Sequence, residues 1–442
     1  MKLVNNRTQS KILFGSLIGN TVEIYDFIIY GTAAALIFNK LFFPSISPLA
    51  GILAAFATNA VGFGARPLGS LIFGHFGDRI GRRYTQVVTL LLTGSATALI
   101  GVLPTYQDVG VFAAFLLVML RIVQGIGYGG EWGGAVLLAT ENGGRKGRGF
   151  RGSWPIIGEI MGVVFATISF SLVSLLSDSE FQAWGWRIPF LLSIPLTTVG
   201  IIIRMRLGET DLFAKLKTNK LLTNKPPVRE LFQKQKRRLL LAVGTGAAHT
   251  LVFYTTTVFI YRYTEQLGIP KSTALLAVMI GSIVAMVTTP IAGLISDRIG
   301  RRYVMMAGTV LTVIFAFPFF WLVGTKVTGL IIVACVLMLG LAWAAILGPK
   351  PALLTELFPT KYRYSAVSLS YSINIAIVGG LTPIVATSLV AVTGGASWGV
   401  SLLMITASLI TFTAVKLLPE GKDALEDDSQ ISPSSEERQI TA

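Results

Sequence analysis

Residues 74–84 read Gly-His-Phe-Gly-Asp-Arg-Ile-Gly-Arg-Arg-Tyr, and residues 293–303 repeat the pattern as Gly-Leu-Ile-Ser-Asp-Arg-Ile-Gly-Arg-Arg-Tyr. Eight of the eleven positions are identical, and each copy follows one long apolar run and precedes another. This repetition indicates two related halves. A short polar turn that carries three arginines between apolar runs is typical of a cytoplasmic loop between transmembrane helices. Its aspartate can pair with those arginines or face the positive end of a neighbouring helix.

The composition is that of a membrane protein. Of 442 residues, 52% are hydrophobic and only 13% are charged, and the mean hydropathy is +0.68. A soluble chain has about 25% charged residues. The first apolar run lacks a small-residue cleavage site, so we expect a retained helix rather than a removed signal peptide. One cysteine, Cys335, and two histidines, His75 and His249, argue against a disulfide framework and against a metal site.

The net charge of +15 follows the membrane topology. Lysines and arginines gather in alternate segments between the apolar runs and near both termini, as the positive-inside rule requires of cytoplasmic segments. We therefore expect both termini in the cytoplasm of a bacterium, an inner-membrane location and an even number of helices. The charge does not indicate nucleic-acid binding.

Twelve apolar runs are long enough to cross about 30 Å of hydrocarbon. They lie at 12–38, 49–74, 84–104, 108–140, 151–177, 187–206, 239–264, 272–296, 303–324, 328–349, 364–393 and 396–418. The predicted fold is an all-α membrane protein with two six-helix pseudo-repeats. Its parts are an N-terminal bundle (1–207), a basic, proline-broken cytoplasmic linker (208–238), a C-terminal bundle (239–418) and a disordered cytoplasmic tail (419–442).

A second pair of landmarks supports the duplication. Glu141 and Arg148 follow the fourth run, and Glu356 and Arg363 follow the tenth with the same spacing. Each half can thus brace its cytoplasmic face with an acid and an arginine near the repeated turn; the alternative is a set of solvated surface charges. The predicted cytoplasmic gate consists of Asp78, Arg79, Arg82, Glu141, Arg148, Asp297, Arg298, Arg301, Glu356 and Arg363.

Glycines at 125, 127, 129 and 130 fit a dinucleotide-binding pattern, but they lie inside an apolar run and not between a strand and a helix. Gly125, Gly129 and Gly133 share one helical face, where small residues permit close helix contact in lipid.

Ionisable residues inside predicted membrane helices indicate function, because each costs at least about 2.5 kcal/mol near the bilayer centre. The first half carries two layers of them. Glu23, Asp26 and Arg121 lie near mid-depth, whereas Arg66, Glu131 and Glu159 lie about 12 Å from the cytoplasmic end at 1.5 Å per residue. Each layer has two acids and one arginine, so one carboxylate per layer has no fixed countercharge and desolvation can keep it neutral.

We expect Glu23, Asp26, Glu131 and Glu159 to take part in proton coupling and Arg66 in intramembrane pairing. The alternative locks every acid in structural pairs or helix caps.

Polar residues that share faces with these charges form the candidate substrate site. On helix 4, Arg121 suits a carboxylate, whereas Gln124 and Tyr128 suit hydroxyl groups. A salt bridge from Arg121 to Glu23 or Asp26 is the structural alternative. The other candidates are Asn20, Tyr30, Trp154, His249, Tyr254, Trp343, Tyr371 and Asn374, with Lys350 near a helix end. The second half therefore supplies mostly aromatic and neutral walls.

Further motifs resemble the metabolite:proton symporter family of the major facilitator superfamily, over nearly the whole chain. They are Glu23-Ile24-Tyr25-Asp26-Phe27, Arg66-Pro67-Leu68-Gly69, Arg121-Ile122-Val123-Gln124-Gly125, Gly129-Gly130-Glu131-Trp132-Gly133-Gly134, Trp184-Gly185-Trp186-Arg187-Ile188-Pro189 and Glu356-Leu357-Phe358-Pro359. The repeated turn is similar to the superfamily signature between helices 2 and 3 and between helices 8 and 9, which latches the cytoplasmic gate. Within the family, residues 30–36, 53–58 and 73–79 are most similar to bacterial shikimate transporters.

The resemblance implies proton-coupled import of a small polar metabolite by alternating access, and a hydroxylated organic acid such as shikimate fits the candidate site. Alternatives are uptake of another carboxylate or zwitterion (2-oxoglutarate, citrate, proline or betaine) and a proton-driven exporter of the same fold. No nucleophile, metal or phosphate-binding pattern supports an enzyme, and we expect no cofactor. The expected partners are an anionic small molecule, protons and the bilayer, and the expected state is a monomer.

Overall fold

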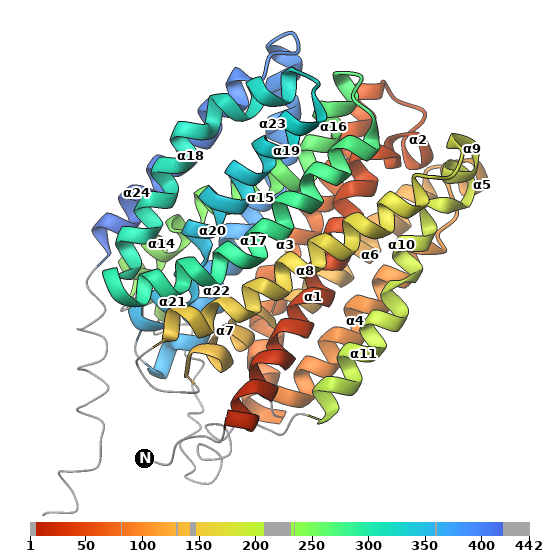
Figure 1. Ribbon diagram of the computed structural model, residues 1–442. Coiled ribbons are helices and arrows are strands. Elements are labelled where there is room, and N and C mark those ends of the chain that lie inside the picture. The colour runs from red at the N-terminus through yellow and green to blue at the C-terminus, as the bar shows by residue number, and fades with distance from the viewer. Residues whose placement is uncertain are drawn as a thin grey trace, which may run out of the picture.

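The computed structural model describes residues 6–80, 82–129, 131–141, 147–206, 231–233, 235–358 and 360–418. These residues are helical throughout, apart from short turns, and Figure 1 shows a tilted bundle of long helices. Eleven of the described helices are long and apolar enough to cross a membrane. The 31-residue helix α1 (Asn6–Leu36), which contains Glu23 and Asp26, supplies the twelfth. The predicted all-α, twelve-helix membrane fold is confirmed.

The first six crossings use α1, α3 (Pro48–Ile80), α4 (Arg82–Gly101), the pair α6 (Phe112–Tyr128) and α7 (Glu131–Glu141), α8 (Arg148–Val173), and α10 (Arg187–Leu191) with α11 (Ser193–Arg206). Short elements join them at one end of the bundle: α2 (Phe38–Phe42), α5 (Tyr106–Val109), α9 (Asp178–Glu180) and the π-helical turn η1 (Phe181–Gly185). We call the other end, where α3 meets α4 and α17 meets α18, the motif end.

The last six crossings begin with α14 (Lys236–Gly244), α15 (Ala247–Tyr254), η2 (Thr255–Phe259) and α16 (Ile260–Gln266), which form one interrupted helix. They continue through α17 (Lys271–Ile299), α18 (Arg301–Gly324), then α19 (Thr328–Cys335), η3 (Val336–Trp343), α20 (Ala344–Leu347) and α21 (Lys350–Leu357). The chain ends with α22 (Thr360–Asn374), η4 (Ile375–Gly379), α23 (Gly380–Val392) and α24 (Trp398–Leu417).

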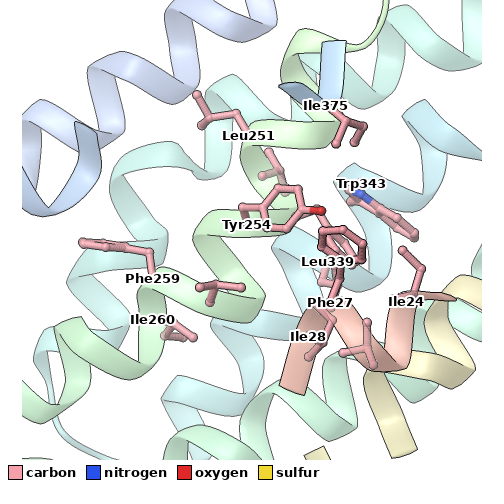
Figure 2. Close-up of a cluster of buried hydrophobic side chains, with 14 of the residues drawn as sticks. Ile24, Phe27, Ile28, Leu251, Tyr254, Phe259, Ile260, Leu339, Trp343 and Ile375 are labelled. Carbon is pink, nitrogen blue, oxygen red and sulfur yellow. The ribbon is translucent and has the colours of Figure 1, made fainter. Parts of the chain in front are cut away.

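Three of the described π-helical segments lie inside membrane-crossing helices of the second half. η2, η3 and η4 interrupt the crossings at Thr255–Phe259, Val336–Trp343 and Ile375–Gly379. Such segments widen a helix locally and are frequent at functional sites. Two of them contact the first half, since η2 packs on α1 and η4 packs on α3. Figure 2 shows Trp343 of η3 beside Ile24 of α1, with Tyr254 of α15 nearby.

The two halves pack against each other along their full depth. In Figure 1, α8 (yellow) runs beside α17 (green), and this pair forms the most extensive contact between the halves. α22 packs on α7 toward the motif end, and α3 packs on α23 toward the opposite end. The interface between the halves therefore encloses the polar side chains of α1, α3, α6 and α8.

Glycines permit the tightest of the helix contacts inside the first half. A Cβ on Gly125 would overlap the carbonyl of Gly62, and a Cβ on Gly129 would overlap the backbone of Arg66. The predicted packing role of these two glycines is confirmed, because only glycine lets α6 approach α3 so closely.

Candidate functional site

Among the described residues, eight charged side chains are buried in the interior, apart from Arg363 near the motif end. The four acids are Glu23, Asp26, Glu131 and Glu159, and the four bases are Arg66, Arg121, Arg204 and Lys350. If all are ionised, their charges cancel. Two ion pairs account for half of the set, and the other two acids and two bases are held by neutral groups.

The first ion pair joins Glu23 of α1 to Arg66 of α3. Glu23 Oε1 lies 3.4 Å from Arg66 Nη1, which is an ion pair without a hydrogen bond. The Arg66 guanidinium also lies over aromatic rings, with its carbon 4.1 Å from the centre of Phe27 and 5.2 Å from that of Phe63. Both Glu23 oxygens and two Arg66 nitrogens are buried without a hydrogen-bond partner, so this pair is loosely held.

The second ion pair joins Glu131 of α7 to Arg204 of α11 through a direct hydrogen bond. Arg204 lies near the end of the sixth apolar run, but its side chain turns into the bundle and is buried. Gly19 of α1 leaves room for it, because a Cβ there would overlap the guanidinium. A close buried pair of this kind accounts for both charges.

Asp26 is held by hydroxyl groups. Thr97 Oγ1 donates to Asp26 Oδ2 at 2.7 Å, and the Tyr128 hydroxyl donates to the same oxygen at 2.9 Å. The other carboxylate oxygen, Oδ1, is buried without a partner. Within the described residues Asp26 forms no ion pair, so its charge can be removed by protonation without leaving a cation exposed to the apolar interior.

Arg121 is held by amides and not by acids. Its guanidinium donates to the side-chain oxygens of Gln124 and Asn59, and Gln124 in turn donates to Thr97 at 2.6 Å. The guanidinium carbon lies 3.9 Å from the centre of the Tyr30 ring and 4.6 Å from that of Phe27. The alternative salt bridge from Arg121 to Glu23 or Asp26 does not form in the described structure, in which Glu23 pairs with Arg66 and Asp26 with hydroxyls.

The Arg121 side chain is 0% exposed and its Nε has no partner. A Cβ on Gly62 would lie 2.9 Å from that Nε, so a glycine borders the cation there. A buried guanidinium with neutral neighbours and a free donor is suited to bind a carboxylate.

Glu159 connects the first half to the second through aromatic rings. Trp132 Nε1 donates to Glu159 Oε1 at 2.6 Å, and the Trp132 ring stacks on Tyr371 of α22, with 3.9 Å between the ring centres and an angle of 4°. This contact joins α7 to the second half. A hydrogen bond to a carboxylate and a stacked pair would both have to change if the halves separated here.

In the second half, Lys350 Nζ lies 3.4 Å from His249 Nε2 and 5.8 Å from the centre of the Tyr371 ring. Thr250 Oγ1 donates to Asn374 Oδ1 at 2.6 Å, and Asn374 Nδ2 donates to the carbonyl of Val243 at 3.2 Å. These bonds fix Asn374 within the second half. Tyr254 instead reaches across the interface and meets Phe63 edge to face, with 5.2 Å between the ring centres.

The remaining candidates fall into two groups. Tyr30 hydrogen-bonds Thr58, and Asn20 donates to the carbonyl of Pro155 at 3.1 Å, so both have structural partners. The indole nitrogens of Trp154 and Trp343 are buried and have no hydrogen-bond partner among the described residues. Trp343 stacks on Phe253 with 5.6 Å between the ring centres and lies beside Ile24 in Figure 2.

At the motif end, Asp297 of α17 binds the first turn of α8 in the other half. Its two oxygens accept from the backbone N–H groups of Gly149 and Phe150, each at 3.0 Å. Arg301 lies 2.6 Å from Asp297 and 3.4 Å from Glu356. A carboxylate at a helix N-terminus is favourable because it meets the positive end of the helix dipole.

The other predicted gate residues are placed as follows. Arg363 donates to the carbonyl of Phe358 at 3.0 Å, Arg298 is exposed near the end of α17, and Arg148 begins α8. Four side chains lie outside the described part of the chain, namely Asp78, Arg79, Arg82 and Glu141. Residues 208–230 and 234 of the predicted linker and the predicted tail also lie outside it.

Five residues of the site were not identified from the sequence: Asn59, Thr97, Trp132, Arg204 and, in its buried role, Lys350. Asn59 and Thr97 are single neutral residues in apolar runs that contain many other such residues. Arg204 and Lys350 stand near helix ends, where a charge usually reaches water. Trp132 could have been found from its position beside Glu131.

The chain is similar to known membrane transporters along most of its length. The family model described as Major Facilitator Superfamily matches residues 17–383 and 246–432. The chain is 41% identical to the inner membrane metabolite transport protein YhjE of Escherichia coli (strain K12), over 87% of this chain and 88% of that protein. It is 36% identical to the shikimate transporter of the same organism, over 93% of this chain and 94% of that protein.

It is also 33% identical to the proline/betaine transporter of Escherichia coli (strain K12), over 94% of this chain and 84% of that protein. Among solved structures, a proton:xylose symporter, XylE, matches with a TM-score of 0.75 over 96% of this chain and 99% of that chain. At 18% identity this match establishes the fold alone. These relatives are transporters, which agrees with the prediction that the chain is not an enzyme. The chain is a multi-pass membrane transporter and belongs to the major facilitator superfamily.

Proposed function

We propose that the chain is a proton-coupled symporter that imports a hydroxylated organic acid, such as shikimate, by alternating access. The observation that carries this proposal is Arg121, a fully buried cation that forms no ion pair with the described residues and is held by amide oxygens and aromatic faces. A buried charge without a countercharge is costly, so its retention points to an anionic ligand. Gln124 and Tyr128 on the same helix face can meet the hydroxyl groups of that ligand.

Of the four buried acids, Asp26 is best suited to carry the coupled proton. It shares Thr97 with Gln124, which contacts Arg121, so a carboxylate at Arg121 would lie close to a second negative charge at Asp26. Two like charges in one apolar site favour protonation of one of them. Binding of the substrate and of a proton would therefore be mutually favourable. Glu23 and Glu159 are further candidates, whereas Glu131 is held by Arg204.

The proposed transport cycle moves two six-helix bundles, residues 1–207 and 239–418, about the site between them. The contacts of Asp297 with α8 and of Trp132 with Tyr371 would close the motif end, and their rupture would open it. We place the protein in the bacterial inner membrane as a monomer. The motif end and both termini face the cytoplasm, in line with the positive-inside rule.

The test is uptake of radiolabelled shikimate into proteoliposomes under an imposed proton gradient. We expect gradient-dependent accumulation by the wild type and its loss, by about a hundredfold or more, in Arg121→Gln, since truncating a buried charged contact costs 2–5 kcal/mol. Arg187→Gln is the matched control, because Arg187 donates to the carbonyls of Gly101 and Leu103 away from the site. Normal uptake by the Arg121→Gln carrier would refute the substrate site.

A zwitterion such as betaine is the second candidate. The observation that favours it is the aromatic group of Phe253, Tyr254 and Trp343 on the opposite wall, because quaternary ammonium groups bind aromatic faces. Glycine betaine should then compete with shikimate for uptake. Absence of competition, together with shikimate transport, would leave the organic acid as the substrate class.

A further inference from the structure

Lys350, like Arg121, is a buried cation without an ion pair among the described residues. Its side chain is 0% exposed. Its hydrogen-bond partner is a neutral acceptor, His249 Nε2 at 3.4 Å, which also contacts Thr250 Oγ1 at 3.2 Å. An ammonium group has three donors. One long bond to a shared imidazole nitrogen leaves most of that capacity unused.

The imidazole beside Lys350 also has unused hydrogen-bonding capacity. His249 Nδ1 is buried and, within the described residues, has no hydrogen-bond partner. Lys350 lies inside the tenth crossing, where α20 continues into α21 through helical backbone at Gly348 and Pro349. The place thus combines a buried lysine with an unused imidazole nitrogen, and an anion could bind both.

A chain of contacts links Lys350 to an acid of the other half. Trp132 donates to Glu159 and stacks on Tyr371, and Lys350 Nζ lies 5.8 Å from the centre of the Tyr371 ring. Within the described residues Lys350 and Glu159 form no direct ion pair. A movement that separated α7 from α22 would part the rings and leave Lys350 beside the opened path.

We propose that Lys350, together with His249, is a second binding site for the carboxylate of the transported acid. This inference rests on the proposed function. Arg121 binds the carboxylate in the first half, and Lys350 receives it in the second half when the Trp132–Tyr371 stack opens. The substrate thereby exchanges one buried cation for another instead of leaving Arg121 directly into water.

The test compares Lys350→Gln with Lys350→Arg in proteoliposomes, with shikimate as the probe. We expect Lys350→Gln to bind shikimate within about threefold of the wild type, because Arg121 is intact, and to slow both uptake and counterflow about tenfold or more. Lys350→Arg should restore most of the rate, and the thermal stability of Lys350→Gln in detergent should match that of the wild type. The matched control is Lys271→Gln, since Lys271 pairs with the exposed Asp178 at the opposite end.

Two results would overturn the inference: wild-type shikimate transport by Lys350→Gln, or a loss of transport in Lys350→Gln that is matched by a loss of thermal stability, which would indicate a structural lysine. If Lys350→Gln does not insert, the wild type still tests the idea. Shikimate should protect Lys350 from an amine-reactive probe, as measured by mass spectrometry, and absence of protection would refute the site. Failure of the proposed function is distinguishable, because Arg121→Gln would then transport shikimate normally.

Discussion

The interiors of the two halves differ in charge. The first half holds seven of the eight buried charges described above, on α1, α3, α6, α7, α8 and α11, whereas the second half holds Lys350. The second half has instead neutral hydrogen bonds, such as that of Thr250 with Asn374, and π-helical segments in three of its crossings. The two halves therefore share a fold but differ in role. The first half provides charges that can bind protons and anions, and the second half provides a largely neutral surface of interrupted helices.

The largest expected effect is on stability, and it shows whether the buried ion pair of Glu131 and Arg204 stabilises the first half. Glu131→Gln would leave Arg204 buried without a countercharge, and we expect a loss of about 3–5 kcal/mol in the free energy of unfolding. Thermal unfolding in detergent measures it. The double variant Glu131→Gln/Arg204→Met should regain much of the loss, because it removes the orphaned charge as well. A single variant as stable as the double one would contradict the role assigned to this pair.

The second prediction separates transport from stability. Asp26→Asn keeps the shape of the side chain and an oxygen that can accept from Thr97 and Tyr128, but it cannot take up a proton. We expect proton-driven accumulation of shikimate to fall about a hundredfold or more while counterflow persists. Uptake with and without an imposed gradient measures this. Thr97→Val is the control, since it removes one hydrogen bond and leaves the carboxyl group. Accumulation by Asp26→Asn at the wild-type level would place the coupled proton elsewhere.

The sequence predicts the fold and the identity of the buried charged residues better than it predicts which of these residues pair with each other. Hydrophobic length and the repeated turn predict twelve helices, because each crossing is decided by a local run. The partners of Arg66 and Arg121 depend on which helix faces meet, and these faces are set by contacts between distant segments. Arg204 illustrates the limit: a charge at the end of an apolar run normally reaches water, and only the position of Glu131 on another helix draws it inward. The π-helical segments likewise have no local signal.

A matched pair of tryptophans sharpens the comparison between the halves. Trp132 donates to Glu159, whereas the indole nitrogen of Trp343 is buried without a partner. Trp132→Phe should therefore cost about 1.5–3 kcal/mol in unfolding free energy for the hydrogen bond to a charged group. Trp343→Phe should cost about 1 kcal/mol less than that, since only packing is lost. Equal losses would mean that Glu159 is not ionised in this state.

The smallest expected effect concerns the motif end, where the halves meet through a charge and a helix N-terminus. Asp297→Asn would weaken the bond to Gly149 and Phe150 by about 0.3–1 kcal/mol and remove a charge that Arg301 also uses. Because this bond joins the halves, we expect the variant to shift the population toward the form open at the motif end by about two- to fivefold. Distance measurements between spin labels on α8 and α17 report that population.

Asp108→Asn is the control for this shift, because Asp108 accepts from Thr105 N at 2.7 Å and caps α5 within the first half alone. Its removal perturbs a helix cap of similar strength without touching the interface. A shift of equal size in both variants would mean that the open population responds to general loosening of the bundle. A shift of the open population in Asp297→Asn alone would show that the contact of Asp297 with α8 holds the motif end closed.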